Sequence, residues 1–208
     1  MSKFSDWTLA KLEDRFGIEL AEDLPALVHW LGQEAEIPEV DRANLLRYQR
    51  ILAENADAWN EQELAMNFIG PVLAMVEFGH FGRYRLFAER PLSGIVNGEE
   101  MSGAPDGLVA RGWWEPKLPY FCFHEYKKEV DSSGDPAAQC LAPMLVAREM
   151  NEDKRPIYGC YVVGRSWRFM VLEHNQYAIS KPFSAADEDL FDIFRALKSL
   201  KTIIEAAM

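Results

Sequence analysis

The sequence is poor in the features that stabilise secreted, zinc-stapled or membrane-spanning proteins. Its 208 residues hold only three cysteines, Cys122, Cys140 and Cys160, with no CxxC pair and no histidine cluster beside them. Disulfide scaffolds and structural zinc sites both need closely paired ligands. The longest apolar runs, such as 68–76, fall short of the ~20 residues of a membrane span, and residues 1–6 lack a secretory apolar segment. We therefore expect buried thiols, no membrane span and a cytoplasmic protein.

Positive charge is also scarce, since the chain has 22 Lys and Arg but 33 Asp and Glu, which gives a net charge of -11. This balance argues against an open surface that grips nucleic acid through its phosphates alone. The acidity is concentrated near the N-terminus. Residues 1–63 hold 6 basic and 14 acidic side chains, whereas residues 64–183 hold 13 and 14. Acidity therefore does not exclude a nucleic-acid site in the later part of the chain.

The hydrophobic pattern divides the chain into two regions. From Trp7 to about Glu54 the apolar residues recur at helical spacing, with a break at Pro38, which predicts a run of short helices. We expect an acidic helical region over 1–58 that packs on a main domain over 59–208. A dedicated partner-binding module is the alternative for the first region.

The main domain mixes helices with strands. A helix is expected from Asn60, with Glu63 in a capping-box position and Pro71 kinking or dividing it. Further helices are expected over 135–150 and 185–207. The expected strands are 84–88, 94–96, 107–110, 120–128, 157–163, 167–172 and 177–179. This order predicts an α/β fold with a central mixed β-sheet flanked by helices.

The segment 120–128 carries the most informative side chains. Because side chains alternate along a strand, one face is expected to hold Phe121, Phe123, Glu125 and Lys127, with Cys122, His124, Tyr126 and Lys128 on the other. Asp106 begins the preceding strand, and an antiparallel pairing would bring it opposite Glu125.

Two adjacent carboxylates repel each other unless a cation lies between them. Hard oxygen ligands that leave room for water suit Mg²⁺, with Mn²⁺ as a substitute. A lysine beside such a cation can orient or help to deprotonate an attacking water. The pattern therefore indicates the hydrolysis of phosphodiester bonds.

The spacing of these residues resembles the PD-(D/E)xK nuclease superfamily. Pro105-Asp106 is followed, after 18 residues, by Glu125-Tyr126-Lys127. The segment 60–64 resembles the opening of the nuclease domain in type I restriction motor subunits. The resemblance implies a restriction-endonuclease-like sheet and the hydrolysis of DNA. It does not decide between DNA and RNA as the substrate.

The resemblance also implies roles for individual residues. Asp106 and Glu125 would be metal ligands, with the backbone carbonyl of Tyr126 as a third, and Lys127 would be the catalytic lysine. Glu61 would complete the metal shell directly or through water.

Two residues on the flanking helices complete the predicted set of site residues. Glu61 is preferred to Glu63 because it lies at i−3 and i−7 from the inward residues Leu64 and Phe68. Gln139, in the first turns of the helix after the motif, would position substrate or water.

Other functions stay open at this stage. An endonuclease of a restriction, defence or repair system is favoured over an exonuclease, and a homodimer would suit cutting of both strands. The alternative is a catalytically silent nuclease-fold protein that serves as a binding or assembly module through 1–58. Trp113 and Trp114 would either stack unpaired bases or cap a hairpin tip. No GxSxG motif or Cys–His pair suited to metal-independent hydrolysis is visible.

Overall fold

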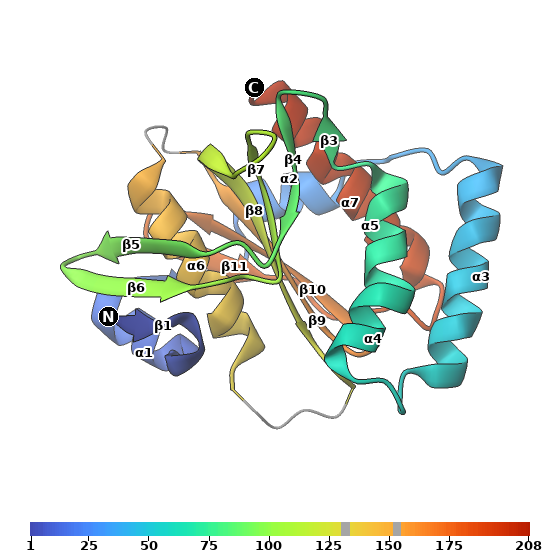
Figure 1. Ribbon diagram of the computed structural model, residues 1–208, viewed down its shortest axis with the longest axis horizontal. Coiled ribbons are helices and arrows are strands. Elements are labelled where there is room, and N and C mark those ends of the chain that lie inside the picture. Colours follow the sequence, from blue (N-terminus) through green and yellow to red (C-terminus); the bar gives the residue numbers. More distant parts are fainter. Residues whose placement is uncertain (130–133, 152–154) are drawn as a thin grey trace.

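The computed structural model describes residues 1–129, 134–151 and 155–208 (Figure 1). Helical elements in these ranges are η1 (Phe4–Asp6), α1 (Leu9–Phe16), α2 (Pro25–Leu31), α3 (Glu39–Asn55), α4 (Glu61–Leu64), η2 (Ala65–Ile69), α5 (Gly70–Val76), α6 (Pro136–Met150) and α7 (Asp189–Ala206). Strands are β1 (Ser2–Lys3), β2 (Glu19–Leu20), β3 (Gly79–His80), β4 (Tyr84–Ala88), β5 (Leu92–Val96), β6 (Glu99–Gly103), β7 (Gly107–Arg111), β8 (Lys117–Lys127), β9 (Ile157–Val163), β10 (Ser166–Glu173), β11 (Gln176–Ile179) and β12 (Phe183–Ser184).

A large mixed sheet forms the centre of the described structure. Its strands follow the order β2-β11-β10-β9-β8-β7-β4-β3, and β12 adds to β10. The β8–β9 and β2–β11 pairs are parallel, and the other pairs are antiparallel. A smaller sheet, β1-β6-β5, lies beside α6 (Figure 1). The prediction of a central mixed sheet flanked by helices is confirmed.

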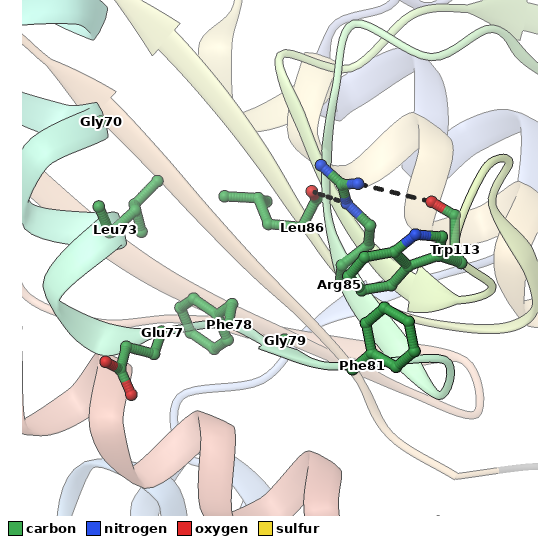
Figure 2. Close-up of a pocket in the computed structure, with 10 residues that line it drawn as sticks. Gly70, Leu73, Glu77, Phe78, Gly79, Phe81, Arg85, Leu86 and Trp113 are labelled. Atoms are coloured by element: carbon green, nitrogen blue, oxygen red, sulfur yellow. Dashed lines mark hydrogen bonds between the residues drawn. The ribbon is translucent and has the colours of Figure 1, made fainter.

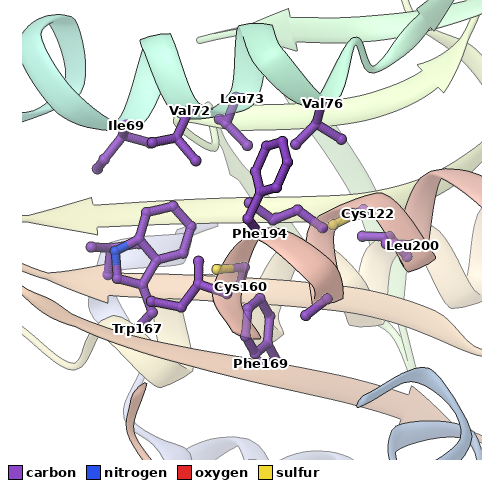
Figure 3. Packing of buried hydrophobic residues seen from close by; sticks show 14 of the residues in the cluster. Ile69, Val72, Leu73, Val76, Cys122, Cys160, Trp167, Phe169, Phe194 and Leu200 are labelled. Atoms are coloured by element: carbon purple, nitrogen blue, oxygen red, sulfur yellow. The ribbon is translucent and has the colours of Figure 1, made fainter. Parts of the chain in front are cut away.

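Two hydrophobic cores cover the two faces of the large sheet. The first packs α2, α3, α5 and α7 against the strands, and Figure 3 shows Val72 and Val76 above Cys122, Cys160 and Trp167. The second core packs α1 and α6 against the opposite face. The layers are therefore helices, sheet and helices. Among the described residues, no helix has both the length and the apolar surface to cross a bilayer.

The N-terminal region is joined to both sheets and both cores. Its strand β1 pairs with β6, and β2 pairs with β11. Leu12 and Phe16 lie in the second core, while Trp30 lies in the first and donates a hydrogen bond from Nε1 to the Ala196 carbonyl at 2.7 Å. Helices α1 to α3 agree with the predicted helical run, whereas the two short strands were not expected. The predicted region 1–58 shares its cores with the predicted domain 59–208.

The predicted helix from Asn60 is divided before Pro71. Asn60 Oδ1 accepts from the Glu63 N–H at 2.9 Å, and Glu63 Oε2 accepts from the Asn60 N–H at 2.8 Å, which is the expected capping box. Pro71 has no N–H to continue the helical pattern. The chain responds with a π-helical segment, η2, in which the Gly70 N–H reaches the Ala65 carbonyl.

A β-bulge in β8 corrects the predicted alternation. Val109 of β7 pairs with Cys122 but Ala110 pairs with Tyr120, so Phe121 is an extra residue. Phe121 accordingly joins the first core with Cys122, while Phe123 joins the second. The prediction that Phe121 shares a face with Phe123 is wrong, because alternation from sequence assumes a regular strand.

Candidate metal-dependent active site

Strand register brings Asp106 and Glu125 together. Strands β7 and β8 are antiparallel, and Gly107 pairs with His124. The residue before Gly107 therefore lies beside the residue after His124, as the sequence predicts. Asp106 Oδ2 accepts a hydrogen bond of 2.6 Å from the Tyr126 N–H, which holds the carboxylate against β8.

Lys127 joins this pair to the first turn of α4. Its Nζ lies 2.8 Å from Glu125 Oε1 and 3.5 Å from Glu61 Oε1. The side chains of Lys127 and Glu125 are only 13% and 9% exposed, whereas Glu61 is 42% exposed. Glu63, in contrast, is occupied by the capping box. The structure thus brings together Asp106, Glu125, Lys127 and Glu61, which we call the acidic cluster.

Burial makes the acidic cluster electrostatically strained. Burial raises the pKa of Asp106 to about 6, opposed by the hydrogen bond from the Tyr126 N–H. Burial and the neighbouring Asp106 raise the pKa of Glu125 to about 7, opposed by Lys127. Burial alone would lower the pKa of Lys127, but the surrounding carboxylates outweigh it and raise that pKa above its ordinary value. The lysine therefore stays charged and, among the described residues, supplies the positive charge that lowers the pKa values of both carboxyl groups.

Glu89 is a fourth carboxylate that the sequence reasoning missed. It follows β4, and its N–H donates to the Asp106 carbonyl at 3.3 Å. Its charge further raises the pKa of Asp106. Glu89, Glu61 and Asp106 line one hollow of about 560 Å³ between α4, α5 and β4. The sequence contained a signal for Glu89, because pairing strand 84–88 with strand 107–110 places the residue after β4 beside the residue before β7.

Tyr126 and Gln139 are the remaining residues predicted at the site, and they lie differently with respect to the acidic cluster. The Lys127 carbonyl accepts from the Gly164 N–H on the β9 side. Since peptide groups along a strand point alternately to its two neighbours, the Tyr126 carbonyl faces β7 and Asp106. Gln139 lies on α6 with its amide against Gly134, where an added side chain would collide with it. Among described residues, no hydrogen bond joins Gln139 to the acidic cluster.

A Cys–His pair lies on the face of β8 opposite to Glu125 and Lys127, although no Cys–His pair suited to hydrolysis was expected. Cys122 Sγ lies 3.5 Å from His124 Nε2, and both side chains are completely buried. Burial lowers the pKa of His124 to about 4 and raises the pKa of Cys122 far above its ordinary value. Both groups are therefore neutral and closed to solvent. This chemistry does not suit a nucleophile and its base.

The acidic cluster is not a preformed metal cage. Within the described ranges, no three His, Cys, Asp or Glu side chains are grouped closely enough to hold an ion by themselves. No model of a known protein family and no curated protein sequence matches the chain. The PD-(D/E)xK resemblance therefore stays a prediction that depends on the residues of the motif.

Proposed function

We propose that this chain is a Mg²⁺-dependent nuclease that hydrolyses phosphodiester bonds at the acidic cluster. The observation that carries this proposal is the carboxylate pair of half-buried Asp106 and buried Glu125, with an ammonium group 2.8 Å from Glu125 and an open hollow beside Asp106. Buried acids with raised pKa values are costly to a fold and are concentrated at functional sites.

The available donors fit Mg²⁺ better than a structural metal. Mg²⁺ is usually held by one or two carboxylates, with water and substrate phosphate completing its shell. Asp106, Glu125 and the Tyr126 carbonyl supply such hard oxygens, and a cage of three acidic side chains is not required. Glu61 would contribute directly or through water, and Mn²⁺ would substitute. When bound, the cation would polarise a phosphoryl oxygen and lower the pKa of a coordinated water.

The side chains of the cluster have separable tasks in this proposal. Lys127 remains protonated because its pKa is raised, so it donates hydrogen bonds to the attacking water or to a phosphoryl oxygen. It is therefore an orienting and charge-stabilising group rather than a base. Glu61, 3.5 Å away and facing the hollow, holds the ammonium in position. Asp106 is fixed by the Tyr126 N–H.

The arrangement of strands supports a restriction-endonuclease-like fold as part of the same proposal. β7 runs antiparallel to β8, β8 runs parallel to β9, and α5 and α6 pack on opposite faces. DNA is the proposed substrate, and a restriction, defence or repair role follows from the resemblance. A homodimer that cuts both strands belongs to this proposal as well.

Cleavage of labelled nucleic acids tests the proposal. Single-stranded DNA, duplex DNA and RNA are incubated with the protein in EDTA, Mg²⁺ or Mn²⁺. We expect metal-dependent cutting that Asp106→Asn and Lys127→Ala abolish. Lys128→Ala is the matched control, because this neighbouring lysine is exposed and follows the last residue of β8.

The absence of cleavage would have a definite meaning if metal binding were absent too. Calorimetry of Mn²⁺ binding to wild type and Asp106→Asn supplies this second measurement. No cutting and no Asp106-dependent binding would refute the nuclease and favour the assembly module that uses residues 1–58.

A further inference from the structure

An exposed aromatic surface lies at the far end of β7 from Asp106. Phe81, in the β3–β4 turn, is 79% exposed, and its ring centroid lies 4.6 Å from that of Trp113. The Arg85 guanidinium lies 5.4 Å from the Trp113 ring centroid, and its Nη1 donates to the Trp113 carbonyl at 3.5 Å. Figure 2 shows these three side chains together at one end of a second hollow, separate from the one beside Asp106. We call Phe81, Arg85 and Trp113 the aromatic platform.

The platform does not contribute to either hydrophobic core. Phe81 and Trp113 belong to neither buried cluster, although each could gain stability from burial. Neighbouring Trp114 is also 82% exposed. Trp113 itself is half-buried beside Phe81. Exposed apolar side chains that gather beside a hollow mark a surface that another molecule covers. The guanidinium and the ring faces suit a flat, electron-rich partner, such as a nucleobase.

Charge beside the platform has the opposite sign to charge at the acidic cluster. The two hollows that meet at Trp113 are lined by four basic side chains and two acidic ones: Arg83, Arg85, Arg111, Lys117, Glu77 and Glu115. The hollow beside Asp106 is lined by three acids and no lysine or arginine. The platform therefore offers local attraction for phosphates on a chain whose net charge is -11.

A continuous surface joins the platform to the acidic cluster. The hollow below Phe81 and Trp113, of about 530 Å³, shares Gly70, Leu73 and Leu86 with the hollow beside Asp106. Asp106 and Trp113 lie at opposite ends of β7, a five-residue strand that spans roughly 17 Å. This span matches about five nucleotides at the ~3.4 Å spacing of a stacked strand.

We propose that the aromatic platform binds unpaired nucleobases of a single-stranded nucleic acid whose backbone follows this surface to the acidic cluster. This inference rests on the proposed function and names its substrate class. Duplex bases are already stacked, and separating them to reach the rings costs free energy that a single strand does not spend. Stacking is tolerant of sequence because every base has a π-face.

Fluorescence anisotropy in EDTA tests binding apart from cleavage. The probe is a labelled 12-nucleotide single-stranded DNA, compared with RNA of the same sequence, a 12-base-pair duplex and a trinucleotide. We expect Phe81→Ala and Trp113→Ala to weaken binding of the 12-mer roughly 5- to 150-fold each, the range for one stacked base. Arg85→Gln should also weaken binding of the 12-mer. The DNA and RNA arms identify which single strand supplies the bases.

Exposed side chains away from the platform provide matched controls. Ile95→Ala removes an apolar group on β5 that is 65% exposed, and Arg195→Gln removes the charge of an arginine on α7 whose side chain is 38% exposed. Both should leave the Kd within about twofold of wild type. Circular dichroism establishes that each variant is folded, which surface truncations generally permit.

The outcomes separate this inference from the nuclease proposal. Bis(p-nitrophenyl) phosphate is too small a substrate to reach the platform from the acidic cluster, so Phe81→Ala should leave its rate of hydrolysis unchanged. Platform-dependent binding without any hydrolysis would refute the nuclease and retain the platform. Equal binding by wild type and Phe81→Ala, duplex binding as tight as single-strand binding, or trinucleotide binding as tight as that of the 12-mer would overturn the platform. Self-association that Phe81→Ala abolishes, with no binding of the oligonucleotides, would also overturn it.

Discussion

Asp106→Asn should stabilise the metal-free protein while removing its proposed activity. The substitution keeps the size of the side chain and an oxygen that can accept the 2.6 Å hydrogen bond from the Tyr126 N–H. It removes a charge that burial disfavours and that Glu61 and Glu89 repel. Glu125 also benefits, because the Asp106 charge is the second cause of its raised pKa.

The expected gain follows from the pKa of Asp106. Its rise from 3.8 to about 6 is about 2 units, or roughly 3 kcal/mol at 1.36 kcal/mol per unit. Asp106 is partly exposed, so solvent screening reduces the expected gain to about 1–2 kcal/mol. The folded state binds the proton more tightly than the unfolded state does. The destabilisation is therefore fully present above pH 6 and disappears as the pH falls below about 4.

Urea unfolding in EDTA at pH 8 and near pH 4 measures this difference. Wild type and Asp106→Asn should differ by about 1–2 kcal/mol in free energy of unfolding at pH 8 and converge at the lower pH. Glu100→Gln, at an exposed acid on β6, should change stability by less than about 0.5 kcal/mol. Added Mg²⁺ should stabilise wild type alone. A loss of more than 1 kcal/mol in Asp106→Asn would show that the carboxylate is a structural cap, and the reasoning would fail.

Two further pairs of variants test separate parts of the structure. Glu61→Gln should reduce metal-dependent cleavage at least tenfold, whereas Glu63→Gln should retain cleavage and stay within about 0.5 kcal/mol of wild-type stability in urea unfolding, because the Gln amide oxygen can still accept from the Asn60 N–H in the capping box; equal cleavage rates would remove Glu61 from the site. Gly159→Ala should cost about 1–3 kcal/mol in the same unfolding assay, since its Cβ would lie 2.7 Å from Met144 Sδ, and Gly79→Ala, where the nearest atom is 3.6 Å away, should cost less.

Local sequence patterns were sufficient to predict most helices and strands of the main domain. Segments such as 157–163 and 167–172 are rich in aromatic and β-branched residues, and they form β9 and β10 at nearly the predicted bounds. Asp135-Pro136 marks the start of α6 because Asp135 accepts from the Ala138 N–H. The pairing of Asp106 with Glu125 was predictable since both signals lie on consecutive strands. Consecutive strands often pair as neighbours.

The features that were missed depend on contacts between distant segments. β6 contains Glu99 and Glu100 and has no clear strand pattern, yet it is held by pairing with β5 and β1. The two-residue strand β2 exists only because β11 lies beside it. The bulge at Phe121 likewise arises from the register of β8 against β7. Such features have no local period, so composition and alternation could not reveal them.

Net charge alone does not describe the surface that the proposed substrate would meet, because positive and negative charges are segregated on it. The acids Glu61, Glu89 and Asp106 line one end of a continuous surface, while Arg83 and Arg85 lie beside the hollows at the other. A phosphate would be repelled at the acidic end until a divalent cation reversed the local charge. In the proposed mechanism, binding at the platform would not need that cation, whereas hydrolysis would. Affinity for single strands should therefore persist in EDTA, whereas cleavage should be lost.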